Sequence, residues 1–222
     1  MTVDTYQVQR LTQPLQVDAK WEKYPWVEVP ALKLAHHMGK HPDHFPHVQV
    51  KLAYDEAALY AIFQVADRYV RALTQNYQDA VFYDSCVEFF FTPGDDEALG
   101  YFNLEMNCGG TALFHHQTGR RENDVAVSAT DFEKVRLAHT LPKIVDPEIE
   151  ENVNWVVEYY LPFEILTHYT PVVQPKQGVT WKVNFYKCAD GSSHPHWLSW
   201  SPVNAPEPDF HRPEFFGILR FD

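Results

Sequence analysis

Short stretches in which apolar and polar residues alternate recur along this chain from residue 48 onward, and they constrain its fold more than any other feature. Val48, Val50, Leu52 and Tyr54, for example, alternate with Gln, Lys and Ala. Successive side chains of a β-strand point to opposite faces, so such alternation is typical of strands. The segments predicted to be strands are 48–54, 59–65, 86–92, 101–107, 111–116, 132–141, 154–161, 181–187 and 216–221. We therefore expect an all-β fold, a two-sheet antiparallel β-sandwich.

Turn residues and one helical segment complete this expectation. Gly109-Gly110 separates two predicted strands and indicates a hairpin turn. Residues 162–166, Pro-Phe-Glu-Ile-Leu, predict one short helix with proline at its start. Residues 1–47 are predicted to be largely irregular. No linker or repeat divides the 222 residues, so a single domain over 1–222 is expected.

The cysteine and charge counts exclude several classes of protein. The three cysteines, Cys86, Cys108 and Cys188, form no CxxC motif, which argues against a disulfide framework and against a structural zinc site built on thiolates. Thirty acidic residues against 18 basic ones give a net charge of −12. Such a surface repels nucleic acids and anionic membranes, so neither is expected as a partner.

Targeting signals are also missing from the printed sequence. Its first residues have neither a basic nor an apolar signal region, and no apolar run approaches a membrane span. The expectation is a soluble chain that is either cytoplasmic or trimmed of an export signal.

Aromatic and imidazole side chains gather in residues 181–202. After an alternating strand, a Gly/Ser loop carries His194 and His196 and is followed by Trp197 and Trp200. Flat indole faces beside hydrogen-bonding groups suit a sugar ring, which has apolar C–H faces and a hydroxyl rim. The alternative is that these rings serve packing.

Carboxylates and amides in the predicted strands supply the polar groups that sugar hydroxyls need. Glu105 and Asn107 alternate on one strand and therefore share a face, and Glu88 and Asn184 lie on strands of similar pattern. The alternative for Glu88 is an ion pair with an arginine, for which the candidates are Arg68, Arg71 and Arg212.

Several motifs together resemble a carbohydrate-binding module of the family 9 type, in its stand-alone bacterial branch, from about Trp21 to the C-terminus. The segments that carry the resemblance are Phe82-Tyr-Asp-Ser-Cys-Val-Glu, Tyr101-Phe-Asn-Leu-Glu-Met-Asn-Cys-Gly-Gly-Thr, Asn184-Phe-Tyr-Lys-Cys, Leu198-Ser-Trp-Ser-Pro and Asp209-Phe-His-Arg-Pro-Glu-Phe-Phe-Gly.

This resemblance implies a β-sandwich that grips a glucan or xylan chain between two aromatic rings, and some family members accompany xylanases. It assigns the rings to Phe82 and Trp200 and a polar contact to Glu88. Phe82, followed by Tyr83, stands where the family pattern suggests tryptophan, and the smaller ring predicts weaker binding. The resemblance also carries the expectation of a structural calcium ion, for which the acidic run 95–97 is the nearest candidate.

Two other functions compete with saccharide binding. Met106 with Lys187, or with a nearby histidine, would supply axial ligands to a b-type haem in an electron-transfer module. Glu88 and Glu105 would be the carboxylate pair of a glycoside hydrolase. The preferred hypothesis is a non-catalytic module whose polar contacts are Glu88, Glu105, Asn107, Asn184, His194 and His196, with Trp197, Trp200, Phe82 and Tyr83 as the aromatic surface.

Overall fold

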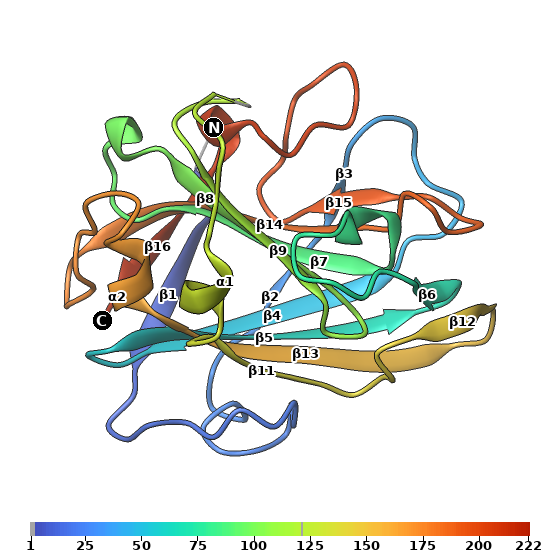
Figure 1. Cartoon of the computed structure of the whole chain (residues 1–222), viewed down its shortest axis with the longest axis horizontal. Helices are drawn as coiled ribbons and strands as arrows, with labels where there is room; N and C mark the ends of the chain where they lie inside the picture. Colours follow the sequence, from blue (N-terminus) through green and yellow to red (C-terminus); the bar gives the residue numbers. More distant parts are fainter. Residues whose placement is uncertain (1–2, 121) are drawn as a thin grey trace.

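The computed structural model describes residues 3–120 and 122–222, which form two β-sheets packed face to face and joined along one edge (Figure 1). The first sheet has the order β10-β9-β8-β7-β14-β16-β1. Its strands are β1 (Thr5–Arg10), β7 (Cys86–Thr92), β8 (Tyr101–Asn107), β9 (Ala112–Gln117), β10 (Val125–Ala126), β14 (Thr180–Cys188) and β16 (Gly217–Phe221). The short strand β15 (Trp197–Ser199) pairs with β14, and β3 (His36–His37) pairs with β15.

The second sheet continues from β1 in the order β1-β4-β5-β13-β11. Its further strands are β2 (Leu32–Lys33), β4 (His47–Tyr54), β5 (Ala58–Asp67), β11 (Arg136–His139) and β13 (Val153–Pro162). A separate pair is formed by β6 (Val70–Ala72) and β12 (Val145–Ile149). The predicted two-sheet β-sandwich is confirmed, and its strands are antiparallel except at β1.

Strand β1 is an exception within residues 1–47, which were predicted to be largely irregular and of which most of 3–47 lies outside helices and strands. Its first four residues pair in parallel with β16 and its last two residues pair in parallel with β4, so it joins the two sheets. Tyr6 and Val8 are buried, whereas Thr5 and Gln7 are exposed. The alternation is present in the sequence, but it spans too few residues to stand out within a polar segment.

One correction concerns the predicted strand 132–141. The structure has a helical turn there, α1 (Ala129–Phe132), and only then β11. Ser128 caps the turn, because its hydroxyl accepts a hydrogen bond from the backbone N–H of Asp131 at 3.1 Å.

The remaining helical segments are short. The helix predicted at 162–166 is confirmed as α2 (Phe163–Leu166), with Pro162 as its N-cap residue. The 3-10 turns are η1 (Val81–Tyr83), η2 (Glu97–Leu99) and η3 (Pro213–Phe215). None of the helices in residues 3–120 and 122–222 has the length and apolar character needed to cross a membrane.

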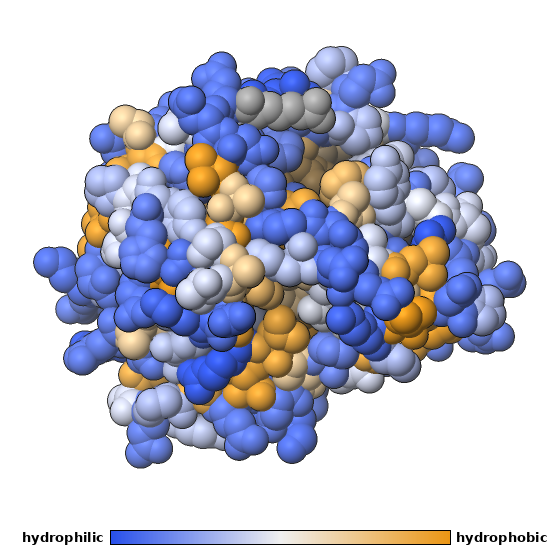
Figure 2. Space-filling model, viewed as in Figure 1, coloured by the Kyte–Doolittle hydropathy of each residue, from blue (hydrophilic) through white to orange (hydrophobic). Residues whose placement is uncertain are grey.

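Aromatic and branched side chains fill the space between the sheets. Phe89 of β7 stacks on Phe185 of β14 with ring centroids 5.0 Å apart, and Trp155 of β13 is fully buried among the same core residues. The face of the molecule seen in Figure 2 is different in character, with mainly hydrophilic side chains and separate apolar groups among them.

Both outer faces of the sandwich are covered by loops. The chain after β15 crosses the first sheet on the side away from the second, and the segment between β1 and β2 covers the far side of the second sheet (Figure 1). Phe210, in the first of these loops, stacks on Tyr186 of β14 at 4.1 Å. The outer face of the first sheet is therefore a second, smaller core, and a cleft opens within it.

Candidate functional site

Two glutamates lie side by side on the outer face of the first sheet. Strand alternation places Glu88 of β7 on this face, and the register pairs it with Glu105 of β8 on one side and with Tyr186 of β14 on the other. Both residues are buried, since Glu88 is 2% exposed and Glu105 is 5% exposed. Buried carboxyls are rare unless paired, so this pair marks the face as chemically distinct.

The two glutamates form the floor of a cleft of about 220 Å³. The cleft lies between η1, the loop after β14 and the loop that covers the sheet. Its lining residues are Phe82, Glu88, Phe90, Glu105, Arg120, Cys188, Asp190, Trp197, Pro208, Asp209, Phe210 and His211.

The hydrogen bonding of the two carboxyls is incomplete. Glu88 Oε1 accepts a hydrogen bond from the Cys188 thiol at 3.0 Å, and Glu105 Oε1 accepts one from the Asn103 amide at 2.9 Å. Glu105 Oε2 is buried and has no hydrogen-bond partner among the described residues. An unsatisfied buried acceptor costs free energy, so this oxygen favours a ligand that donates a hydrogen bond.

Burial also changes the protonation of the pair. It raises the pKa of Glu88 well above its usual range, and the nearby Cys188 and Glu105 raise it further. Burial raises the pKa of Glu105 to about 7, although the hydrogen bond from Asn103 opposes this effect. The pair therefore retains at least one proton near neutral pH, and it can both donate and accept hydrogen bonds.

Aromatic side chains form the walls of the cleft. Trp197 is held by a hydrogen bond from its Nε1 to Asp190 Oδ1 at 2.8 Å, and both residues line the cleft. Phe82, on η1, packs against Tyr83 with ring centroids 4.8 Å apart. Both Phe82 and Trp197 are partly exposed, so each presents ring surface to the cleft.

Charged groups complete the rim. Arg120 forms an ion pair with Asp209 at 2.7 Å, and His211 Nδ1 lies 2.9 Å from the hydroxyl of Tyr101. The cleft thus combines two partly exposed rings, two buried carboxyls and a polar rim. This combination suits a small neutral polyol better than an extended apolar ligand.

Trp200 lies elsewhere, in the core between the sheets. Its ring is 5.7 Å from that of Phe185, and its residue is 9% exposed. A Cβ atom at Gly217 would approach the indole to within 2.6 Å, which explains why the chain has glycine at that position. The structure therefore places Trp197, and not Trp200, beside the glutamates.

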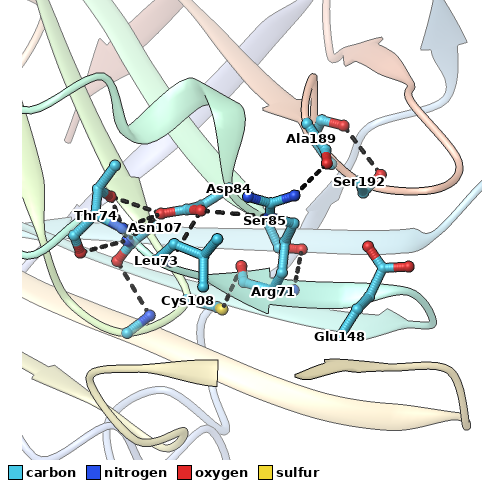
Figure 3. A network of polar contacts seen from close by, with 12 residues as sticks. Arg71, Leu73, Thr74, Asp84, Ser85, Asn107, Cys108, Glu148, Ala189 and Ser192 are labelled. Atoms are coloured by element: carbon cyan, nitrogen blue, oxygen red, sulfur yellow. Dashed lines mark hydrogen bonds and ion pairs between the residues drawn. The ribbon is translucent and has the colours of Figure 1, made fainter. Parts of the chain in front are cut away.

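The two asparagines named from the sequence hold the fold together. Asn107 donates to Asp84 and to the Thr74 hydroxyl, both at 2.9 Å, and its carbonyl accepts from the backbone of Gly109 and Thr111 (Figure 3).

The amide of Asn184 has a comparable structural role. It donates to the Ser201 carbonyl at 3.1 Å and accepts from the Ser201 N–H at 2.9 Å. Neither asparagine lines the cleft.

Asp84, in the motif that ends at Glu88, is the centre of the network in Figure 3. Its carboxylate accepts from the backbone N–H groups of Leu73 and Thr74, each at 3.0 Å, and Arg71 Nε lies 3.7 Å away. Arg71 also donates to the carbonyl of Gly191. The two acidic residues of this motif therefore have different roles: Asp84 holds the neighbouring loops by hydrogen bonds, and Glu88 lines the cleft.

The remaining candidates also lie outside the cleft. His194 stacks on Tyr69 at 3.6 Å, and Tyr83 is 53% exposed beside Phe82. His196 is buried, and its Nε2 lies 2.7 Å from the ammonium group of Lys187. Burial lowers the pKa of His196 to about 3, so this imidazole is neutral.

The haem alternative is not favoured by the geometry. Met106 and Lys187 lie in the same sheet with Val87 of β7 between them, not on strands that face one another. The ammonium of Lys187 is engaged with His196 and lies 3.5 Å from Asp67. Met106 belongs to the core between the sheets.

The residues do not fit a calcium site. In the acidic run, Asp96 caps the backbone N–H of Ala98 at 2.9 Å and Glu97 pairs with Lys182 at 2.7 Å. In the described ranges, one group of three close potential metal ligands is found, and it contains two cysteines. Calcium prefers oxygen ligands, so this group does not suit it. Calcium binding stays a prediction.

Several cleft residues were not predicted from the sequence. Asp190 lies in the aromatic segment 181–202, and Asp209 begins the last of the family motifs. Only the fold shows that both residues line the same cleft. Cys188 was counted and not assigned, although its alternation with Tyr186 and Asn184 would have put it on the same face.

Comparison with known proteins agrees with this description. The model of carbohydrate-binding family 9 matches residues 15–221, and the chain belongs to that family. No curated protein matches the chain.

Solved structures resemble it over its whole length. A crystal structure of a Bacteroides uniformis protein, provisionally described as carbohydrate-binding, has a TM-score of 0.89 at 26% identity and covers 100% of both chains. A family 9 module from Caldicellulosiruptor kristjanssonii in complex with cellotriose has a TM-score of 0.66 at 14% identity, covering 99% of this chain and 94% of that one. The glucose complex of a family 9 module from the same organism has a TM-score of 0.63 at 15% identity, covering 99% and 96%.

Proposed function

We propose that this chain is a non-catalytic carbohydrate-binding module that holds a sugar ring of a glucan- or xylan-type saccharide in the cleft between Phe82 and Trp197. The rings contact the C–H faces of the sugar, and Glu88 and Glu105 bind its hydroxyls. The observation that carries this proposal is the buried Oε2 of Glu105, which has no hydrogen-bond partner among the residues that the structure describes and lies beside partly exposed aromatic rings. Family membership, and the glucose and cellotriose bound by the Caldicellulosiruptor modules, support the same class of ligand.

The arrangement of the glutamates argues against hydrolysis. Cleavage of a glycosidic bond needs two carboxyl groups that flank it, one as acid and the other as base or nucleophile. Here Glu88 and Glu105 are direct cross-strand neighbours on one floor of the cleft. They can hold adjacent hydroxyls, but they do not enclose a bond between them.

Calorimetric titration with glucose, xylose, cellobiose and cellotriose tests the proposal. Trp197→Ala and Phe82→Ala should each weaken binding at least about tenfold, which corresponds to roughly 1.4 kcal/mol. Tyr83→Ala is the matched control for Phe82, because it removes an exposed neighbouring ring outside the cleft.

Trp200→Phe is the second control, because it retains an aromatic ring in the core. It should leave the affinity within about twofold, a change of roughly 0.4 kcal/mol. Loss of binding in Trp200→Phe with normal binding in Trp197→Ala would overturn the proposed site. Absence of binding to all four sugars by the folded wild type would overturn the ligand class.

A further inference from the structure

Two cysteines lie directly opposite each other beneath the cleft. Cys86 is the first residue of β7 and Cys188 the last of β14, and the antiparallel register pairs them. Both are free thiols, and both are at most 1% exposed. Their separation along the chain hides this pair from any motif search, which is why the sequence predicted no thiolate metal site.

Glu88 is the third member of this group. It lies two residues after Cys86 on the same face of β7, and the ligand atoms of Cys86, Glu88 and Cys188 all lie within 4.8 Å of one another. Zinc binds sulfur at about 2.3 Å and carboxylate oxygen at about 2.1 Å, so tetrahedral ligands stand roughly 3.5–3.8 Å apart. The three atoms therefore reach a tetrahedral metal with small side-chain adjustments and no movement of the strands.

The charges around the group also favour a cation. Asp190 and Glu105 add negative charge nearby, whereas the cation on the adjoining strand position, Lys187, points to the opposite face and is engaged with His196. Burial raises the pKa of Cys86 to about 12, so without a metal the group remains protonated.

A position for a fourth ligand exists on the cleft side. Glu105 stands directly across from Glu88, and its buried Oε2 has no hydrogen-bond partner in the described part of the chain. Glu88 and Cys188 themselves line the cleft, so an ion can enter from solvent through it.

We propose that Cys86, Glu88 and Cys188 form a binding site for a thiophilic divalent d10 cation, of which zinc is the commonest, with Glu105 or water as the fourth ligand. Binding converts two thiols and one carboxylic acid to their anions and releases three protons, because metal ligands must be deprotonated. The ligated ion then carries a net charge of −1 before Glu105 is counted. Two thiolates select against calcium and magnesium, which prefer oxygen.

The proposal does not depend on saccharide binding, but it affects the same cleft. The metal takes Glu88, and in one form Glu105, from the groups that the proposed function gives to sugar hydroxyls. A zinc-loaded protein should therefore bind glucose more weakly than the metal-free protein.

Titration of the metal-free, fully reduced protein with Co²⁺ and then Zn²⁺, in the absence of sugar, tests the site. We expect one cobalt ion per chain, with a sulfur-to-cobalt charge-transfer band that zinc abolishes, and proton release that grows as the pH falls. Cys86→Ser and Cys188→Ser should each weaken zinc binding by more than about 100-fold, beyond the range for loss of a group that only orients a ligand. Cys108→Ser is the matched control, because Cys108 is equally buried but lies outside the group.

Three results would overturn the site. One is the absence of stoichiometric binding by a chain with three titratable thiols, and another is equal weakening by Cys108→Ser. The third is a single free thiol in the unreduced, denatured protein, which would show that a disulfide occupies at least one of Cys86 and Cys188. Should a serine variant fail to fold, X-ray absorption of the zinc-loaded wild type decides the matter, since the site requires two sulfur neighbours at about 2.3 Å.

Discussion

The two outer faces of this sandwich each bury a strand carboxylate under a loop, and the two are satisfied in different ways. Glu158 of β13, beneath the segment between β1 and β2, accepts hydrogen bonds from the backbone of Ala19 and from Trp26 Nε1, both at 2.7 Å, and pairs with Lys23 at 2.9 Å. Glu105, beneath the loop between β15 and β16, has one oxygen without a hydrogen-bond partner within residues 3–120 and 122–222. A carboxylate whose oxygens are all satisfied by its own chain anchors a loop, whereas one that lacks a donor is ready for a ligand.

The largest expected effect of this difference is on stability, at Glu158. Glu158→Ala leaves the buried indole N–H of Trp26 and the backbone N–H groups of Asp18 and Ala19 without their acceptor, and it removes one of the two carboxylates that pair with Lys23. It should therefore lower the free energy of unfolding by about 3–5 kcal/mol. Urea denaturation measures this loss. Glu28→Ala, at an exposed site in the same segment, should stay within about 0.5 kcal/mol. Equal losses of stability in the two variants would show that Glu158 does not anchor the loop.

Glu105 should behave in the opposite way. Glu105→Gln keeps the shape and removes an acid whose burial is unfavourable, so the stability at pH 7 should change by less than about 1 kcal/mol, whereas sugar affinity should fall at least about tenfold. Calorimetry and urea denaturation of the same preparation measure both quantities. If Glu105→Gln bound sugar normally but were strongly destabilised, Glu105 would be a structural anchor like Glu158.

The raised pKa of Glu105 also predicts a pH dependence. The folded state holds this proton up to about pH 7, whereas the unfolded chain releases it near the ordinary glutamate pKa of 4.5. Because the folded state binds more protons in this window, stability is fully present below pH 4.5 and is lost as the pH rises to about 7. The loss should be on the order of 1–3 kcal/mol, and Glu105→Gln should reduce it. If the free energy of unfolding rose between pH 5 and pH 7, and by the same amount in the wild type and in Glu105→Gln, this assignment would be contradicted.

The smallest expected effect is on saccharide affinity, at the aromatic wall of the cleft. Phe82→Trp enlarges one of the two partly exposed rings that line the cleft and should tighten cellotriose binding several-fold, by roughly 0.5–1 kcal/mol. Tyr83→Trp enlarges an exposed ring next to it and should not change the affinity. Tightening by both variants would indicate a binding surface outside the cleft.

The sequence was sufficient for most of the fold because strand alternation is a local signal. The boundaries predicted for 86–92 and 101–107 agree with β7 and β8. Strand β1 was missed because its partners, β4 and β16, are distant in the chain, and only their pairing makes six residues a strand. The helix α1 was missed because its cap, Ser128, stands just before a segment whose composition favours a strand.

The site was less predictable because it depends on register. Trp197 and Trp200 are three residues apart, so in an extended segment they point to opposite faces and only one can reach the cleft. The pairing of Trp197 with Cys188 decides between them, and no local pattern reveals that pairing. Glu88 and Glu105, predicted from the sequence to contact the saccharide, both line the cleft, and each alternates with apolar core residues on its own strand.

A crystal structure of the protein with cellotriose would show directly whether the cleft binds the saccharide. We expect one sugar ring between Phe82 and Trp197, with a hydroxyl within hydrogen-bond distance, about 2.5–3.0 Å, of Glu105 Oε2. A saccharide bound at another surface, with the cleft filled only by water, would contradict this expectation.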